Sequence, residues 1–120
     1  MLYTDAVRFR VVLKNLMDNV VRFSDPAKAL KYVYVGIEMS PDTCTITWTD
    51  NGMGISAAYL PKIFDPFFKG TDNAKGMGLG LYMARNILRK LGGSITVESI
   101  VNSGTAFTIV LPNERDGMIR

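Results

Sequence analysis

The chain of 120 residues is 48% hydrophobic, which supplies apolar material for one small domain with a single two-layer core. Its net charge of +3, from 14 Lys and Arg against 11 Asp and Glu, suits a phosphate-bearing ligand but falls short of the clustered basic stripe of a nucleic-acid binder. Histidine is absent and Cys44 is the only cysteine, which excludes histidine-based metal sites and general bases, a phosphoacceptor histidine, an internal disulfide and a cysteine zinc site.

The sequence also indicates a cellular compartment. No apolar run approaches the roughly 18 to 20 residues of a membrane span, and the start, "MLYTDAVRFR", lacks the apolar core of a signal peptide. A single cysteine fits a reducing environment. These features predict a cytoplasmic chain without direct membrane contact, and they leave open a membrane anchor elsewhere in a full-length protein.

The first predicted element is a helix from Asp5 to about Phe23. Apolar residues recur there at helical spacing, and the segment 24–28, "SDPAK", breaks the pattern. Apolar side chains then alternate with other residues through 33–39 and again through 43–50, on either side of a turn-forming "SPD". The two alternating segments predict a β-hairpin.

The connection 51–78 is predicted to be irregular, with a short helix expected within 56–64. A second long helix is predicted over about 79–91, where Gly92 and Gly93 stop it.

The last two predicted strands cover 94–99 and 104–112, and a short polar connection at 102–104 suits a hairpin turn. The whole order is therefore helix, hairpin, loop, helix, hairpin. This order predicts an α/β (α+β) two-layer sandwich, in which helices cover one face of a largely antiparallel sheet.

Three polar side chains of the first helix share one face. Asn15, Asn19 and Arg22 are spaced i, i+4 and i+7, beside the apolar stripe of the same helix. A solvated polar face is the plain alternative, and for a lone asparagine it would be preferred. Two amides and a guanidinium in a line, however, offer neutral oxygen ligands to Mg²⁺ and positive charge to phosphates.

A carboxylate stands at the end of the second predicted strand. If Trp48 faces the core, the period of two places Asp50 on the same inward side, where a carboxylate is costly unless a donor contacts it. Gly52 and Gly54 follow, and they let a flat ligand approach the backbone while the carboxylate accepts from an exocyclic amine. A simple Asp-Asn-Gly turn is the alternative reading of this stretch alone.

A glycine-rich stretch opens the second long helix. Gly76, Gly78 and Gly80 precede its apolar pattern, an arrangement that commonly holds an anion at a helix N-terminus. The spacing matches neither the dinucleotide fingerprint nor the P-loop. A flexible linker is the alternative, but Lys69 and Lys75 in the segment before the glycines suit a phosphate-covering lid.

Together these residues resemble a known family. The stretches "LKNLMDNVVRFS", "DNGMGI", "IFDPFF", "GMGLGL" and "GTAFTIVLP" are similar, in order and spacing, to the N, first G, F, second G and third G boxes of the catalytic ATP-binding domain of sensor histidine kinases, which belongs to the superfamily shared with gyrase and Hsp90. The resemblance covers nearly the whole chain. It implies a Bergerat-type sandwich with a mixed sheet, and ATP bound between the helical layer and a lid.

The resemblance assigns roles to individual residues. It implies that Asn19 is the Mg²⁺ ligand, that Asn15, Asn19 and Arg22 form the catalytic set, and that Asp50 reads adenine. Gly52 and Gly54 line the base, and the glycines at 76, 78 and 80 lead the triphosphate to the helix N-terminus. Further ATP-binding residues implied by the same motifs, with the two lid lysines, are Phe23, Ile55, Phe64, Lys69, Lys75, Met77, Leu79, Leu81 and Thr105.

Several positions depart from the family pattern. Arg22 stands where lysine is usual and keeps the charge, Val20 replaces a small residue, and Met77 replaces a threonine or serine whose hydroxyl the lid often uses. The lid segment 68–76 is short. The chain begins just before the N box, so the expectation is a single ATP-binding domain over 1–120 that lacks its first strands and has no dimerisation or phosphoacceptor domain.

The expected function is transfer of the ATP γ-phosphoryl group to a histidine on a separate dimerisation domain, in two-component signalling with a response-regulator receiver domain as a further partner. Phosphoryl transfer needs mainly positioning and charge neutralisation. In hydrolysing relatives a glutamate activates water where this chain has Asn15, which is no base, and this favours a kinase over an ATPase. An anti-sigma-type serine kinase and a non-catalytic nucleotide-sensing module remain alternatives, whereas the scattered charges argue against nucleic acid.

Overall fold

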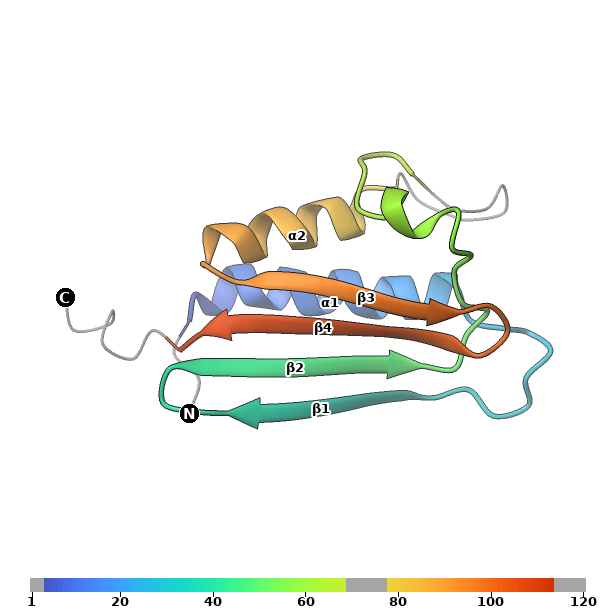
Figure 1. The fold of residues 1–120 in the computed structure, drawn as a ribbon, viewed down its shortest axis with the longest axis horizontal. Coiled ribbons are helices and arrows are strands. Elements are labelled where there is room, and N and C mark those ends of the chain that lie inside the picture. The colour runs from blue at the N-terminus through green and yellow to red at the C-terminus, as the bar shows by residue number, and fades with distance from the viewer. Residues whose placement is uncertain (1–3, 69–77, 114–120) are drawn as a thin grey trace.

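The computed structural model describes residues 4–68 and 78–113. Its elements confirm the predicted order of helix, hairpin, loop, helix and hairpin (Figure 1). In chain order they are α1 (Ala6–Arg22), β1 (Val33–Met39), β2 (Thr43–Asp50), the 3-10 helix η1 (Leu60–Lys62), α2 (Gly80–Lys90), β3 (Ser94–Ile100) and β4 (Gly104–Pro112).

Helix α1 begins where a side chain caps it. The carboxylate of Asp5 accepts hydrogen bonds from the backbone N–H groups of Val7 and Arg8, both at 3.1 Å. At the other end the N–H of Phe23 donates to the carbonyl oxygen of Asn19. The predicted limits of this helix are therefore confirmed to within one residue at each end.

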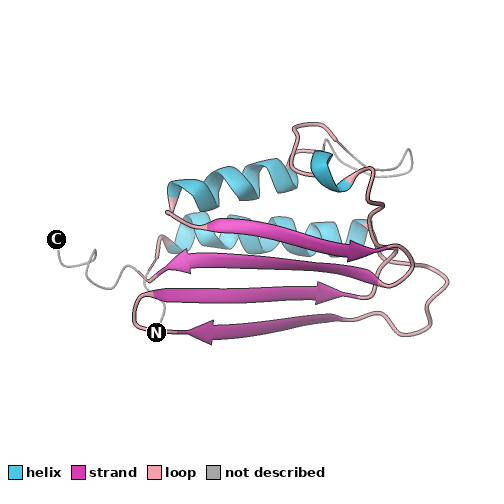
Figure 2. Cartoon of the chain, in the orientation of Figure 1, coloured by secondary structure: helices cyan, strands magenta, loops and turns pink. Residues whose placement is uncertain are grey.

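The four strands form one sheet in the order β1-β2-β4-β3, and each of the three pairings is antiparallel. The inward residues of β2 alternate as predicted, with Cys44, Ile46 and Trp48 all buried. On β4, which pairs with β2, Phe107 and Ile109 are fully buried on the same side. Both helices cover this face, which confirms the two-layer sandwich (Figure 2).

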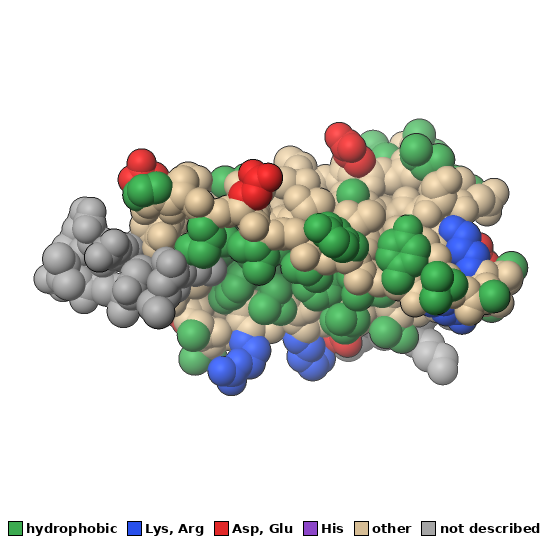
Figure 3. Space-filling model, turned by 90° about the horizontal axis from the view of Figure 1, so that it is seen from below, with side chains coloured by type: hydrophobic (Ala, Val, Ile, Leu, Met, Phe, Trp, Pro, Cys, Tyr) green, Lys and Arg blue, Asp and Glu red, His purple; other side chains and the backbone are tan. Residues whose placement is uncertain are grey.

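Strand β1 lies at the edge of the sheet and keeps an apolar face exposed. Val35 and Ile37 pair with Trp48 and Ile46, so they lie on the helix side, yet Ile37 is 62% exposed. Val21 of α1 is exposed as well. Figure 3 shows apolar side chains gathered on this side of the molecule. Alternation predicted the strand, but it did not predict that the described residues leave its apolar face uncovered.

One end of the sandwich collects the segments that carry the predicted motifs. The C-terminal end of α1, the end of β2 and the turn between β3 and β4 lie at the same end of the molecule, and the N-terminus of α2 points toward that end (Figure 1). In the described ranges, no helix has both the length and the apolar character needed to span a bilayer.

Candidate functional site

A cavity of about 650 Å³ opens at this end of the sandwich. It is bounded by α1, by the segment that follows β2, by the first turn of α2 and by the turn between β3 and β4. Ten predicted site residues line it: Asn15, Asn19, Arg22, Phe23, Gly54, Ile55, Gly78, Leu79, Gly80 and Leu81. Motifs up to 66 positions apart in the sequence (from 15 to 81) thus meet around one space.

The polar face of α1 forms one wall. Asn19 is 6% exposed, so it is a buried polar residue rather than part of a solvated face. The amide nitrogen of Asn15 is also buried and has no hydrogen-bond partner among the described residues. A buried donor without an acceptor is costly, and a ligand oxygen at this position would satisfy it.

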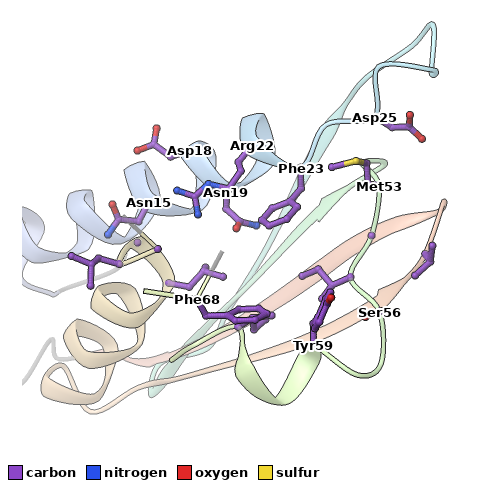
Figure 4. A pocket seen from close by; sticks show the side chains of 18 of the residues that line it. Asn15, Asp18, Asn19, Arg22, Phe23, Asp25, Met53, Ser56, Tyr59 and Phe68 are labelled. Carbon is purple, nitrogen blue, oxygen red and sulfur yellow. The ribbon is translucent and has the colours of Figure 1, made fainter. Parts of the chain in front are cut away.

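An apolar wall stands across from α1. Figure 4 shows Tyr59 and Phe68 on this side of the cavity, facing the α1 side chains. The two rings pack edge to face with centroids 5.5 Å apart. Ile55 is held here by its backbone N–H, which donates to the hydroxyl of Ser99 at 2.7 Å. An apolar wall that contains aromatic rings suits a planar ring system.

Gly54 allows the apolar wall to lie against the end of β3. Its φ of +76° is in the left-handed region, and a Cβ at this position would lie 2.2 Å from the carbonyl oxygen of Ile100. Glycine is therefore required here by contact with the protein's own backbone. The predicted approach of a ligand to Gly54 stays a prediction beside this structural reason.

We expect Gly54→Ala to lower the free energy of unfolding by roughly 1 to 3 kcal/mol, because the variant must move backbone or accept a strained φ. Urea denaturation measures this. Gly36→Ala in β1 is the matched control, since the nearest atom to a Cβ there is Tyr34 Cε1 at 3.4 Å. Equal urea midpoints for the two variants would contradict the close approach.

The first turn of α2 completes the cavity. Gly78, with φ +72°, leads into the helix, and its carbonyl accepts from the N–H of Phe67 at 2.9 Å. Among the described residues, no side chain caps the N-terminus of α2 at Leu79. Gly80 brings α2 close to α1, since a Cβ on Gly80 would lie 3.8 Å from Cβ of Asn15. An uncapped helix N-terminus that lines a cavity attracts anions through its N–H groups and dipole.

Asp50 is buried as predicted but lies behind the cavity wall. It is 6% exposed, and its Oδ1 accepts from the N–H of Gly52 at 2.7 Å. Burial raises the pKa of Asp50, while backbone hydrogen bonds from Gly52 and Thr105 and the charge of Lys28 act in the opposite direction. The carboxylate therefore helps to organise its own loop.

Asp50 and Gly52 line a smaller cavity of about 290 Å³, between the end of α1 and the start of β1. A Cβ on Gly52 would lie 2.9 Å from Asp50 Oδ1 and 2.4 Å from the carbonyl oxygen of Phe23. Gly52 thus separates Asp50 from Phe23, which lines the main cavity. The predicted adenine contact of Asp50 and the predicted ligand contact of Gly52 stay predictions.

Two other predicted residues support the walls from outside the main cavity. Phe64 packs edge to face on Phe107 with ring centroids 6.5 Å apart, and the guanidinium of Arg85 lies 5.2 Å from its ring. Thr105 is buried, and its hydroxyl lies 2.8 Å from that of Ser99. The predictions for Lys69, Lys75, Gly76 and Met77 fall outside the described residues.

Sequence reasoning missed half of the cavity lining. Met53 and Phe68 lay inside the recognised motifs, so the motifs themselves were the available signal. The turn residues between β3 and β4 carried no local signal, because only the packing of the turn brings them to the cavity. The residues missed are Asp18, Asp25, Met53, Ser56, Tyr59, Ile63, Phe68, Met83, Val101 and Asn102.

Comparison with known proteins gives a consistent result. The family model described as "Histidine kinase-, DNA gyrase B-, and HSP90-like ATPase" matches residues 4–115. The chain is 36% identical over 115 residues to the sensor protein RprX of Bacteroides fragilis (strain YCH46), which covers 92% of the chain and 22% of RprX. It is 32% identical over 112 residues to the sensor histidine kinase RcsC of Escherichia coli (strain K12), covering 90% of the chain and 11% of RcsC.

A solved structure shares the fold. The mycobacterial sensor histidine kinase MprB superposes with a TM-score of 0.78 and 28% sequence identity, over 92% of this chain and 76% of that one. Of the two curated relatives, RprX and RcsC, the chain spans only about a fifth of the length or less. The family match, which covers most of the chain, means that this protein is an ATP-binding domain of the histidine kinase-, DNA gyrase B- and HSP90-like ATPase family.

Proposed function

We propose that the chain is the catalytic domain of a sensor histidine kinase, which binds Mg²⁺-ATP in the main cavity and donates the γ-phosphoryl group to a histidine on a separate dimerisation domain. The observation that carries this proposal is the meeting of the α1 amides with the N-terminus of α2. Gly80 packs directly against Asn15 where both line the cavity, and Asn19 is buried in the same α1 wall. Relatives named as sensor kinases support the reaction class.

The shape and chemistry of the cavity orient the nucleotide. The triphosphate belongs at the uncapped N-terminus of α2, where backbone N–H groups and the amide of Asn15 can donate to its oxygens. Arg22 on the same wall adds positive charge. The base belongs against the apolar wall of Ile55, Tyr59 and Phe68, with Asp50 as the proposed acceptor for the adenine amine.

Mg²⁺ fits this site as an ion held mainly by the nucleotide. The described residues contain no cluster of three or more Asp, Glu, Cys or His side chains that could hold a metal. The amide oxygen of Asn19 would supply one neutral ligand, and phosphate oxygens and water the others. The bound ion neutralises charge on the phosphates, while Asn15, Asn19 and Arg22 position them.

The acceptor must come from another domain, because the chain has no histidine. A response-regulator receiver domain would take the phosphoryl group next. The proposal also keeps the cytoplasmic location and the lid with Lys69 and Lys75. Strand β1 is the outer strand of the described sheet, which supports the expectation that a further strand pairs there.

We expect the isolated chain to bind Mg²⁺-ATP yet to accumulate no acid-labile phosphate until a histidine-bearing dimerisation domain is added. The reason is that the chain has no histidine acceptor, and Asn15 offers no base to activate water. Incubation with γ-labelled ATP, alone and with the partner domain, measures this. A partner domain whose histidine is replaced by glutamine is the control.

Two outcomes of that experiment would replace the proposal. Label that survives acid on the isolated chain would indicate phosphorylation of serine or threonine, as in an anti-sigma-type kinase. Tight ATP binding without transfer to any histidine-bearing domain would indicate a nucleotide-sensing module.

A further inference from the structure

Lys28 lies in the connection between α1 and β1, outside the main cavity, yet it contacts two of the segments that build the cavity wall. Its ammonium lies 2.8 Å from the carbonyl oxygen of Asn51, 3.4 Å from that of Gly52 and 2.7 Å from that of Asn102. An ammonium has three N–H donors, so each of these carbonyls can receive one. The contacts span 23, 24 and 74 positions of sequence.

The carbonyls that Lys28 binds belong to backbone that forms one end of the cavity. The N–H of Met53 donates to the carbonyl of Phe23, and the N–H of Asn102 donates to the carbonyl of Met53, both at 2.8 Å. Phe23, Met53 and Asn102 all line the cavity. These three residues, called the base-end wall below, adjoin Gly54 and Ile55 of the apolar wall, against which we place the base. Figure 4 shows Phe23 and Met53 away from the side of the cavity at Asn15 and α2, where we place the phosphates.

The backbone conformation at Asn102 shows why this wall needs hydrogen bonds to fix it. Asn102 adopts a left-handed φ of +68°, which is uncommon for a residue with a side chain. Two further hydrogen bonds join the loop after β2 to the connection between α1 and β1. The side chain of Asn51 donates to the carbonyl of Leu30 and accepts from the N–H of Tyr32. Charge-assisted hydrogen bonds are in general stronger than neutral ones, and of the contacts named here those of Lys28 carry the charge.

We infer that Lys28 is a positioning residue for the base of the nucleotide: its ammonium fixes the loop after β2 and the turn between β3 and β4 in the arrangement that forms the base-end wall. This inference rests on the proposed function. Lys28 does not line the cavity. It acts through its hydrogen bonds to Asn51, Gly52 and Asn102. The positive charge also favours the ionised form of Asp50, which lies next to Gly52.

The test is Lys28→Met in the full chain, with ADP and inorganic triphosphate as separate probes in calorimetry. We expect the dissociation constant for ADP to rise about tenfold, because charged hydrogen bonds to the wall are lost. The affinity for inorganic triphosphate, which occupies only the phosphate end, should be unchanged. A general loss of structure would weaken both probes together, and that result would overturn the inference.

Three further variants sharpen the result. Lys28→Arg keeps charge and donors and should restore most of the ADP affinity; an arginine variant as weak as the methionine one would contradict the role of the cation. Lys31→Met removes the same charge from an exposed lysine of the same connection and should bind ADP like the parent. If Lys28→Met does not fold, Lys28→Gln keeps a donor and should show the same selective loss of ADP affinity in weaker form.

The outcomes for Lys28 and for the proposed function can be separated. If the parent chain binds neither ADP nor ATP, the proposed function is wrong. If the parent binds ADP and Lys28→Met binds it equally well, only the positioning role is wrong.

Discussion

Asp50→Asn is expected to weaken ADP and ATP binding about tenfold to a hundredfold. The carboxylate accepts from the backbone N–H groups of Gly52 and Thr105, so an amide would turn an N–H group toward one of these donors. Such a mismatch in a buried site costs roughly 1 to 3 kcal/mol. Titration calorimetry measures the affinity, and equal values for the variant and the folded parent would rule out a role for Asp50.

A second nucleotide separates the two ways in which Asp50 can act. Inosine triphosphate carries a carbonyl where ATP has its exocyclic amine, so a parent that reads the amine should prefer ATP by about tenfold. The Asn variant should lose that preference. If the preference persists while both affinities fall, Asp50 only organises the loop of Gly52 and does not read adenine.

The stability of Asp50→Asn provides a control with a defined sign. Burial raises the pKa of Asp50 above its ordinary value, so between the two values the native state holds a proton that the unfolded state has released. This contribution to stability is complete below the ordinary pKa and is lost as pH rises through the raised one. The fall in Tm of the parent as the pH rises above the ordinary aspartate pKa should therefore be larger than that of the variant.

Asn19→Ala is expected to spare nucleotide binding without metal and to reduce Mg²⁺-dependent phosphoryl transfer on the order of a hundredfold. Asn19 is buried in the α1 wall, where its amide oxygen is the proposed metal ligand. Without it, phosphates and water hold the ion in poorer geometry. The measurement is ADP affinity with Mg²⁺ and with a chelator, followed by transfer to the histidine-bearing domain.

The metal dependence decides the assignment of Asn19. The parent should bind ADP more tightly with Mg²⁺ than with chelator, and the variant should lose most of this gain. Asn86→Ala in α2 is the matched control, because it makes the same change at an asparagine that does not line the cavity. A full Mg²⁺ gain in Asn19→Ala would show that another group holds the ion.

The elements of this fold could be predicted from the sequence because their causes are local. Helix α1 begins at its Asp5 cap, and its apolar stripe recurs at helical spacing. The period of two in β2 placed Trp48 and Asp50 on one face, and the structure buries both. The glycines at 78 and 80 predicted the position of the α2 N-terminus. Each of these features depends on residues a few positions apart, which pattern and capping rules describe.

Only the tertiary structure decided how the predicted residues share the site. Asp50 lies behind Gly52, because the backbone of Phe23 lies against Gly52. The end of β3 lies against Gly54 in the same way. Phe64 and Thr105 support the walls through their contacts with Phe107 and Ser99. These are contacts between segments far apart in the chain, and no local period encodes them.

The same reason explains what the sequence could not reveal at all. Lys28 sits in a connection with no motif, and its three carbonyl partners come together only when the loop after β2 meets the turn between β3 and β4. The residues of β1 alternate between apolar and other types like those of a buried strand. Whether its apolar side chains are buried depends on which elements cover that face of the sheet. The sequence alone thus determined the elements and the family, while packing between distant segments decided which side chains line the cavity, which support it and which stay exposed.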